Sequence, residues 1–145
     1  MKSNEFYRSP TWRYFTKYVL LSWSNNGIVF CITCGKPMDI TDKDCCTGHL
    51  IKAFDGNSTN FSTAFEYHNC APQCNQICNR HGHGKPDIMY RKLVEKYGQD
   101  NIDRLYLQKT SSLQLDKFTM DLFKNEFKQK FESLVKIKGN PWLKK

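Results

Sequence analysis

Seven cysteines, all between positions 31 and 78, constrain this 145-residue chain more than any other feature. Their number is odd, and Cys31-Ile-Thr-Cys34 is followed by Gly, a spacing typical of one half of a zinc site. The surrounding stretch is rich in Gly, Asn, Asp and Thr and has few large apolar side chains, so it needs a staple such as a bound metal. Metal ligation therefore fits these cysteines better than disulfides. Cys45 and Cys46 have no partner at ligand spacing and are expected to be packing residues.

A second pair of ligands has to close the site. Cys74-Asn-Gln-Ile-Cys78 is the first candidate, although three residues separate its thiols instead of the usual two. Cys78 with His81, or Cys70 with Cys74, are alternatives. We predict a structural zinc ion held by four thiolates, those of Cys31, Cys34, Cys74 and Cys78.

Charge divides the chain into three parts. Residues 1–30 carry a net charge of +3, residues 31–108 are neutral, and residues 109–145 carry +5. We predict an N-terminal basic helical segment, a metal-bound core and a C-terminal basic amphipathic helix with these bounds. Basic flanks around a neutral core indicate a polyanionic partner, of which nucleic acid is the most plausible.

Targeting signals are not evident in the sequence. No apolar run approaches the roughly 20 residues of a membrane span, and the first residues carry charges and aromatic rings instead of an apolar signal core. We expect a cytoplasmic protein that does not bind membranes.

Helix signals lie at both ends of the chain. Ser9 and Pro10 favour a helix start, and the apolar period predicts a helix over 9–22. A short strand is expected over 28–30 and a flexible loop over 55–60. Helices are predicted over 87–97, ended by Gly98, and over 101–107.

The last helix carries an apolar stripe at steps of three and four residues. We expect this helix to pack on the N-terminal helix or to form a homodimer with a second copy of the chain. The stripe consists of Phe118, Leu122, Phe123, Phe127, Phe131, Leu134 and Val135.

Histidine and asparagine residues alternate with the cysteine pairs in an order that is typical of a class of nucleases. His49 stands in Thr-Gly-His-Leu-Ile-Lys, Asn69 follows His68, and Asn79 directly follows Cys78. This is the order of a ββα-metal (HNH-type) nuclease. A neutral imidazole suits the general base of phosphodiester hydrolysis, and oxygen ligands suit a Mg²⁺ or Mn²⁺ ion at the scissile phosphate.

Four stretches, CITCGK, TGHLIKA, HNCAPQCNQICN and MYRKLVEKYG, together resemble the lambdoid-phage NinG (Rap) recombination nucleases. The resemblance covers about residues 31–107. It implies an α+β fold, with a zinc-stapled ββα-metal (HNH-like) core flanked by N- and C-terminal helices. It also implies a metal-dependent DNA endonuclease, with branched recombination intermediates as the expected substrate in the bacterial host.

The resemblance assigns roles to three residues. His49 would be the general base, Asn69 would tie the intervening loop to the strand or orient the histidine, and Asn79 would bind the catalytic ion. Many HNH enzymes have an Asp ligand where this chain has Gly48. Because the second cysteine pair has an extra residue, His83 or His81 is an alternative ligand of the catalytic ion.

Cations near the core and on the terminal helices are expected to contact the DNA backbone without reading sequence. Two other readings stay open, a nicking nuclease for ordinary duplex DNA and a non-catalytic zinc module that binds nucleic acid. The predicted DNA-contacting residues are Lys52, Arg80, Lys85, Arg8, Arg13, Lys17, Lys124 and Lys128, with Lys117, Lys130, Lys136 and Lys138 as further candidates on the last helix.

Overall fold

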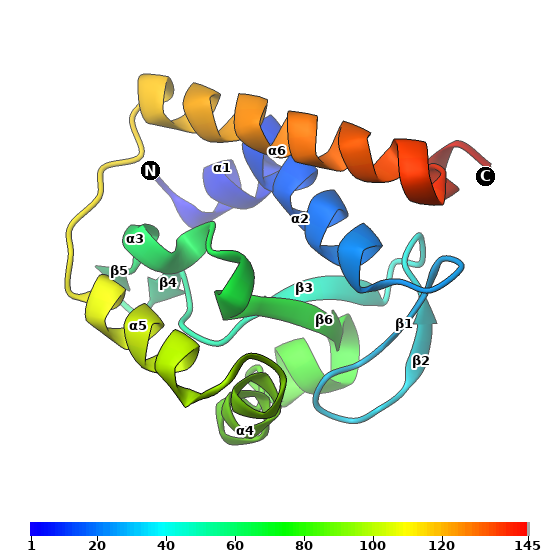
Figure 1. Ribbon diagram of the computed structural model, residues 1–145. Helices are drawn as coiled ribbons and strands as arrows, with labels where there is room; N and C mark the ends of the chain where they lie inside the picture. Colours follow the sequence, from blue (N-terminus) through cyan, green and yellow to red (C-terminus); the bar gives the residue numbers. More distant parts are fainter. Residues whose placement is uncertain (145) are drawn as a thin grey trace.

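The computed structural model describes residues 1–144 and combines helices with short strands (Figure 1). The helices are α1 (Ser3–Arg8), α2 (Pro10–Trp23), α3 (Phe61–Ala64), α4 (Pro86–Tyr97), α5 (Gln99–Lys109) and α6 (Lys117–Lys138), with the shorter turns η1 (Tyr67–Asn69), η2 (Asn75–His81) and η3 (Pro141–Lys144). The strands are β1 (Ile28–Phe30), β2 (Pro37–Asp39), β3 (Cys45–His49), β4 (Phe54–Asp55), β5 (Ser58–Thr59) and β6 (Cys70–Cys74). Within the described range they pair as three antiparallel two-stranded sheets, β1–β2, β3–β6 and β4–β5.

The β3–β6 pair is the centre of the fold. Its register runs from Cys45 opposite Cys74 to His49 opposite Cys70. In Figure 1 α2 lies between this pair and α6, while α4 lies on the opposite side. Because side chains alternate along a strand, β3 presents Thr47 and His49 to α2 and presents Gly48 to the α4 side.

Helix α2 begins as the sequence predicts. The Ser9 hydroxyl accepts a hydrogen bond from the Trp12 backbone N–H at 3.1 Å, and Pro10 occupies the first helical position. The helix runs to Trp23, one residue beyond the predicted end. The preceding α1 was not predicted because its six residues are too few to display a helical period. Phe6 of α1 is nevertheless fully buried against the aromatic core.

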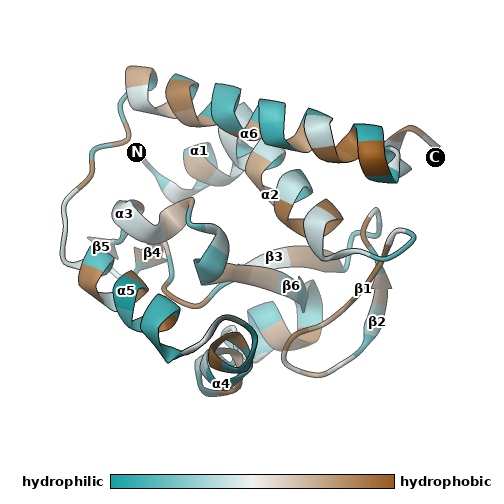
Figure 2. Ribbon diagram, in the orientation of Figure 1, coloured by the Kyte–Doolittle hydropathy of each residue, from teal (hydrophilic) through white to brown (hydrophobic). Residues whose placement is uncertain are grey.

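The apolar stripe of α6 packs on α2 and closes the monomer core. Phe127 and Phe131 are buried, and the Phe127 ring lies 4.8 Å from that of Phe15. Figure 2 shows hydrophobic and hydrophilic residues alternating along this helix. Phe118 and Leu122 at its start stay exposed. The expected packing on the N-terminal helix is therefore confirmed, and the homodimer stays a prediction.

Three local expectations need adjustment. The segment 55–60 is not a plain loop, because β4 and β5 form a small hairpin around Gly56, whose φ of +60° suits its turn. The predicted helix over 87–97 appears as α4, one residue longer at its start, with Gly98 after its end. The next helix, α5, extends beyond the predicted 101–107 at both ends.

Membrane-spanning helices are absent from residues 1–144, where no helix is both long and apolar enough to cross a bilayer.

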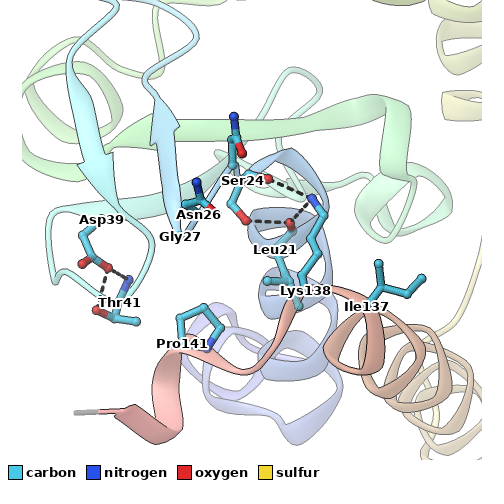
Figure 3. Close-up of a pocket in the computed structure, with 10 residues that line it drawn as sticks. Leu21, Ser24, Asn26, Gly27, Asp39, Thr41, Ile137, Lys138 and Pro141 are labelled. Atoms are coloured by element: carbon cyan, nitrogen blue, oxygen red, sulfur yellow. Dashed lines mark hydrogen bonds between the residues drawn. The ribbon is translucent and has the colours of Figure 1, made fainter.

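Lys138 connects the end of α6 to the end of α2 (Figure 3). Its ammonium donates hydrogen bonds to the carbonyl oxygens of Leu21 at 2.9 Å, Ser22 at 3.1 Å and Ser24 at 2.8 Å. These carbonyls belong to the last turn of α2 and its C-cap, where a helix dipole is negative and intrahelical donors are missing. Lys138 therefore caps α2, and its DNA contact stays a prediction.

Replacing Lys138 by Met should therefore destabilise the protein. Loss of a charge-assisted cap costs about 1 kcal/mol, which corresponds to a fall of about 3 °C in Tm for a chain of this size. Lys136→Met removes an exposed lysine from the same helical turn and is the matched control, with little expected effect. Thermal unfolding followed by circular dichroism measures both. Equal Tm values for the two variants would contradict the cap.

Candidate metal centre and histidine site

Four sulfur atoms meet where the two cysteine pairs converge. The Sγ atoms of Cys31, Cys34, Cys74 and Cys78 all lie within 4.8 Å of one another. The Cys34 and Cys74 sulfurs are 3.8 Å apart. A tetrahedral zinc ion with Zn–S bonds of about 2.3 Å requires sulfurs about 3.8 Å apart, so this donor set fits the ion. The predicted four-cysteine set is the one that the fold assembles, and it could hold a zinc ion.

The first cysteine pair is shaped by a tight turn after β1. The Gly35 N–H donates to the Cys31 carbonyl at 2.8 Å, and the Cys31 N–H donates to the Lys36 carbonyl at 2.8 Å. Gly35 has a φ of +77°, which a glycine adopts without strain. This explains why Gly follows the second cysteine of the pair.

The second cysteine pair tolerates its extra residue because η2 is wound as a π-helix. Its hydrogen bonds span five residues, as in the bond of 2.7 Å from the Gly82 N–H to the Ile77 carbonyl. The wider turn returns Cys78 to Cys74 although three residues separate them. The unusual spacing is thus accommodated by local backbone geometry.

Hydrogen bonds prepare one of the thiols for metal binding. Burial raises the pKa of Cys31, but donors from the Thr33 hydroxyl and nearby backbone N–H groups outweigh burial and bring the pKa to about 6. The Cys74 N–H is one of these donors, 3.3 Å from the Cys31 sulfur. Cys31 therefore favours the thiolate form that a metal ion needs.

Asp44 links the strands to the second cysteine pair. Its carboxylate pairs with Lys36 at 2.9 Å and accepts a hydrogen bond from the Gln76 N–H at 3.0 Å.

The three remaining cysteines lie outside the sulfur cluster. Cys45 and Cys70 are buried in the core, and the Cys46 thiol donates to the Gln73 carbonyl at 3.2 Å.

His49 lies at the end of β3, under α2. Its Nε2 is 2.8 Å from the Ala64 carbonyl oxygen, and its ring stacks on Trp12 with centroids 5.1 Å apart. Since a carbonyl only accepts, Nε2 carries the proton and Nδ1 of the neutral ring keeps its lone pair. Burial lowers the pKa of His49 below its ordinary 6.5, with the Ala64 hydrogen bond opposing the shift. The imidazole is therefore neutral at pH 7 and has Nδ1 as its proton acceptor.

Asn69 joins the segment after β3 to the helix that follows. Its side-chain oxygen accepts from the Ile51 N–H at 2.8 Å, and its amide nitrogen donates to the carbonyls of Ile51 and Thr63, each at 3.0 Å. The side chain is fully buried and uses all three contacts to hold backbone. Of its two expected roles, tying the loop to the strand matches these contacts.

Gly48 is required by close approach of Gln73. A Cβ at position 48 would overlap the Gln73 amide oxygen. The Gln73 amide nitrogen donates to the Thr33 hydroxyl at 3.1 Å and to the Gly84 carbonyl at 2.8 Å, so the side chain cannot easily move aside. An acidic residue in place of Gly48 would therefore have to displace the Gln73 side chain from these two hydrogen bonds.

The other candidate ligands are dispersed. Asn79 lies in η2, where its amide nitrogen is 3.4 Å from the Asn75 side-chain oxygen. His83 and His81 are exposed, and His68 packs on Tyr97 with ring centroids 4.5 Å apart. In residues 1–144 the sulfur cluster is the one group of three or more His, Cys, Asp or Glu side chains close enough to bind a metal together.

The predicted DNA-contacting cations occupy several surfaces. Arg8 and Arg13 are exposed on α1 and α2, while Lys17 of α2 lies beside the Trp142 and Phe131 rings. Lys52 and Lys85 both lie near the glycine-rich turn after η2, and Arg80 is exposed within η2. On α6, Lys128 is exposed and Lys124 lies 3.6 Å from Asp121.

Sequence reasoning missed the partners of His49. The Ala64 carbonyl is a backbone atom, so no residue type could indicate it. Trp12 lies 37 positions away, and only the packing of α2 on β3 brings it to the imidazole. Gln73 was detectable in principle, because a polar residue between buried neighbours in a short strand indicates a specific partner.

The family model described as "Bacteriophage Lambda NinG protein" matches residues 1–138. The chain belongs to the NinG family. The match includes the sulfur cluster, His49 and all of α6, so the terminal helices are part of the family unit. Comparison with curated proteins and with solved structures gives no match.

Removing one ligand should release the metal of this NinG-family chain. Cys34→Ser should lower zinc content and cost on the order of 3–5 kcal/mol, about 10 °C in Tm, because metal binding supplies folding energy. Cys46→Ser is the matched control, since that thiol lies outside the cluster and a hydroxyl can keep its hydrogen bond. Elemental analysis and thermal unfolding of untagged protein are the measurements. If elemental analysis finds no zinc in purified wild-type protein, the zinc site is refuted.

Proposed function

We propose that this NinG-family protein is a metal-dependent DNA endonuclease in which His49 acts as the general base. The state of that side chain carries the proposal. Nε2 donates to the Ala64 carbonyl at 2.8 Å, so Nδ1 can accept a proton from an attacking water. Burial keeps the ring neutral near pH 7, which a base requires.

The order β3, β6, η2 supports a ββα-metal core. The sulfur cluster fastens the end of β6 and η2 to the turn after β1, and Asn69 fixes the segment that leaves His49. Both contacts reduce motion around the proposed base. Positioning of this kind is a large part of catalysis in phosphoryl transfer.

Asn79 is the proposed ligand of a catalytic Mg²⁺ or Mn²⁺ ion. Its amide nitrogen faces Asn75, which leaves its side-chain oxygen as a donor atom for a hard cation. His83 is the alternative ligand. When bound, such an ion stabilises the charge that develops on the scissile phosphate and leaving oxygen.

Branched recombination intermediates are the proposed substrate, and the bacterial host cytoplasm is the proposed location. Membership of the NinG family supports both. The excess of +8 in net charge supports a polyanionic substrate. The proposed backbone contacts are those of the exposed cations on α1, α2, η2 and α6.

Replacing His49 by Ala should abolish most cleavage. A general base contributes about 10²- to 10⁴-fold in rate, and a loss of this size is expected in kcat with zinc content retained. The assay compares nicking of a supercoiled plasmid and cutting of a synthetic four-way junction with Mg²⁺ or Mn²⁺.

The matched control for this variant is His68→Ala. The recorded ring contacts of His68 are with Tyr67 and Tyr97, not with His49 or Trp12, so cleavage should stay near the wild-type rate. Near-normal cleavage by His49→Ala would exclude His49 as the base.

The lowered pKa of His49 also predicts the pH dependence. The ring is neutral above its folded pKa, so the acid limb of kcat/KM should have its midpoint below pH 6.5. In the window between the folded pKa and 6.5 the unfolded chain binds more protons, so stability should fall as pH drops through it. A pH–rate profile on the junction substrate tests this, and an acid limb at or above 6.5 would contradict it.

A non-catalytic zinc module that binds nucleic acid is the second candidate. One observation favours it, because Gly48 offers no carboxylate beside His49. In the described part of the chain the only cluster of His, Cys, Asp or Glu side chains that could bind a metal is the sulfur cluster, which does not include His49. Absence of cleavage by wild-type protein with either metal, on plasmid and junction alike, would decide for this candidate. Cleavage of plasmid and junction at equal rates would favour a nicking nuclease for ordinary duplex DNA.

A further inference from the structure

A groove of about 560 Å³ lies between α2 and η2, and residues of β3 also line it. On the α2 side it runs from Trp12 to Leu20, nine residues whose helical rise is about 12 Å. The opposite side is formed by the amides and cation of η2. The lining residues used below are Tyr7, Arg13, Lys17, Asn79, Arg80 and Trp142.

Cations face the groove from both sides. Arg13 and Lys17 come from α2 and Arg80 comes from η2, whereas Asp42 is the one acidic residue among the described residues that line it. The recorded ion pairs of residues 1–144 involve none of these three cations. Unneutralised cations on two facing elements favour an extended anion between them.

Aromatic rings accompany these cations. Tyr7 is 41% exposed and packs edge-on against Trp12, 5.2 Å between centroids. Lys17 lies 5.3 Å from the centroid of the Trp142 ring. Cations that follow a backbone together with rings that stack on unpaired bases are the two elements of single-strand recognition. A duplex, whose bases are already stacked, would use only the cations.

The groove adjoins the proposed active site. Trp12 lines the groove and stacks on His49, and Thr47 lines it from the same face of β3 that carries His49. Asn79, the proposed cation ligand, lines it from η2. A strand lying in the groove would therefore reach Asn79 and the Trp12 ring that stacks on the proposed base.

We propose that the groove between α2 and η2 binds a single-stranded segment of DNA, with Arg13, Lys17 and Arg80 contacting its phosphates. The choice of DNA rests on the proposed function, whereas the single-stranded state rests on the lining of the groove. In a branched substrate the groove would bind the unpaired DNA next to the branch point. The lysines of α6 would contact DNA outside the groove.

The test measures binding of a fluorescein-labelled 20-nucleotide DNA strand by anisotropy at several salt concentrations. It uses full-length, zinc-loaded protein without Mg²⁺ or Mn²⁺. The triple variant Arg13→Gln, Lys17→Gln, Arg80→Gln should bind more weakly. The slope of log affinity against log salt should fall by about 2, because each lost phosphate contact on a single strand removes about 0.7.

A second triple variant provides the charge-matched control. Arg91→Gln, Arg104→Gln, Lys109→Gln removes the same charge from exposed positions on α4 and α5, so its slope should stay close to that of wild type. Tm and zinc content confirm that both variants fold. Equal losses of single-strand affinity in the two triple variants would show that only net charge matters and would overturn the proposal. A groove variant that binds the single strand as tightly as wild type would also overturn it. A loss confined to a 20-base-pair duplex would overturn the single-stranded assignment.

Cleavage assays separate this proposal from the proposed function. If wild-type protein cleaves nothing with Mn²⁺ but the groove variant alone loses single-strand binding, the endonuclease proposal fails and the groove stands. If wild-type protein cleaves a junction and the groove variant binds the strand unchanged, the groove proposal fails and the nuclease stands.

Discussion

The convergence of four cysteine sulfurs joins the turn after β1 to the end of β6 and to η2, alongside the hydrogen bonds of Asp44 and Gln73. Cys34 and Cys74 are forty residues apart in sequence and 3.8 Å apart in space. The first pair follows a three-residue strand, and the second has Cys74 at the end of β6 and Cys78 inside the π-helical turn η2. Neither β1 nor η2 buries much apolar surface of its own. A metal ion at this point would fix η2 and the end of β6 against the turn after β1, and with them the position of Asn79.

The alternation of side chains along β3 separates two environments that adjoin in sequence. Thr47 and His49 face the aromatic core under α2, while Gly48 faces Gln73 on the α4 side. The imidazole is therefore enclosed by Trp12 and the Ala64 carbonyl, which makes it neutral and sets its tautomer. The glycine before it is explained by steric exclusion, because the Gln73 amide already fills the space of a side chain.

The terminal helices are part of the same unit as the metal centre. Helix α2 packs on β3 and β6 with one face and on α6 with another, and Lys138 of α6 caps its end. Through α2, the C-terminal helix supports the side chains that enclose His49. This accounts for a NinG family match that extends over residues 1–138 instead of stopping at the cysteine-rich core. It also places the basic face of α2 beside the site, where a polyanion would be held.

The sequence by itself determined the features that depend on local chemistry. Cysteine spacing identified the four residues whose sulfurs converge, Ser9 and Pro10 marked the start of α2, and Gly98 marked the end of α4. Thiolate geometry and helix capping act over a few residues, so the local sequence is enough to indicate them. Tertiary structure alone decided the tautomer of His49, the need for glycine at position 48 and the capping role of Lys138. Each of these depends on atoms that are distant in sequence, and two of them depend on backbone carbonyls, which carry no residue identity. Periodicity can indicate which face of a helix is buried, but only the packed fold decides what that face meets.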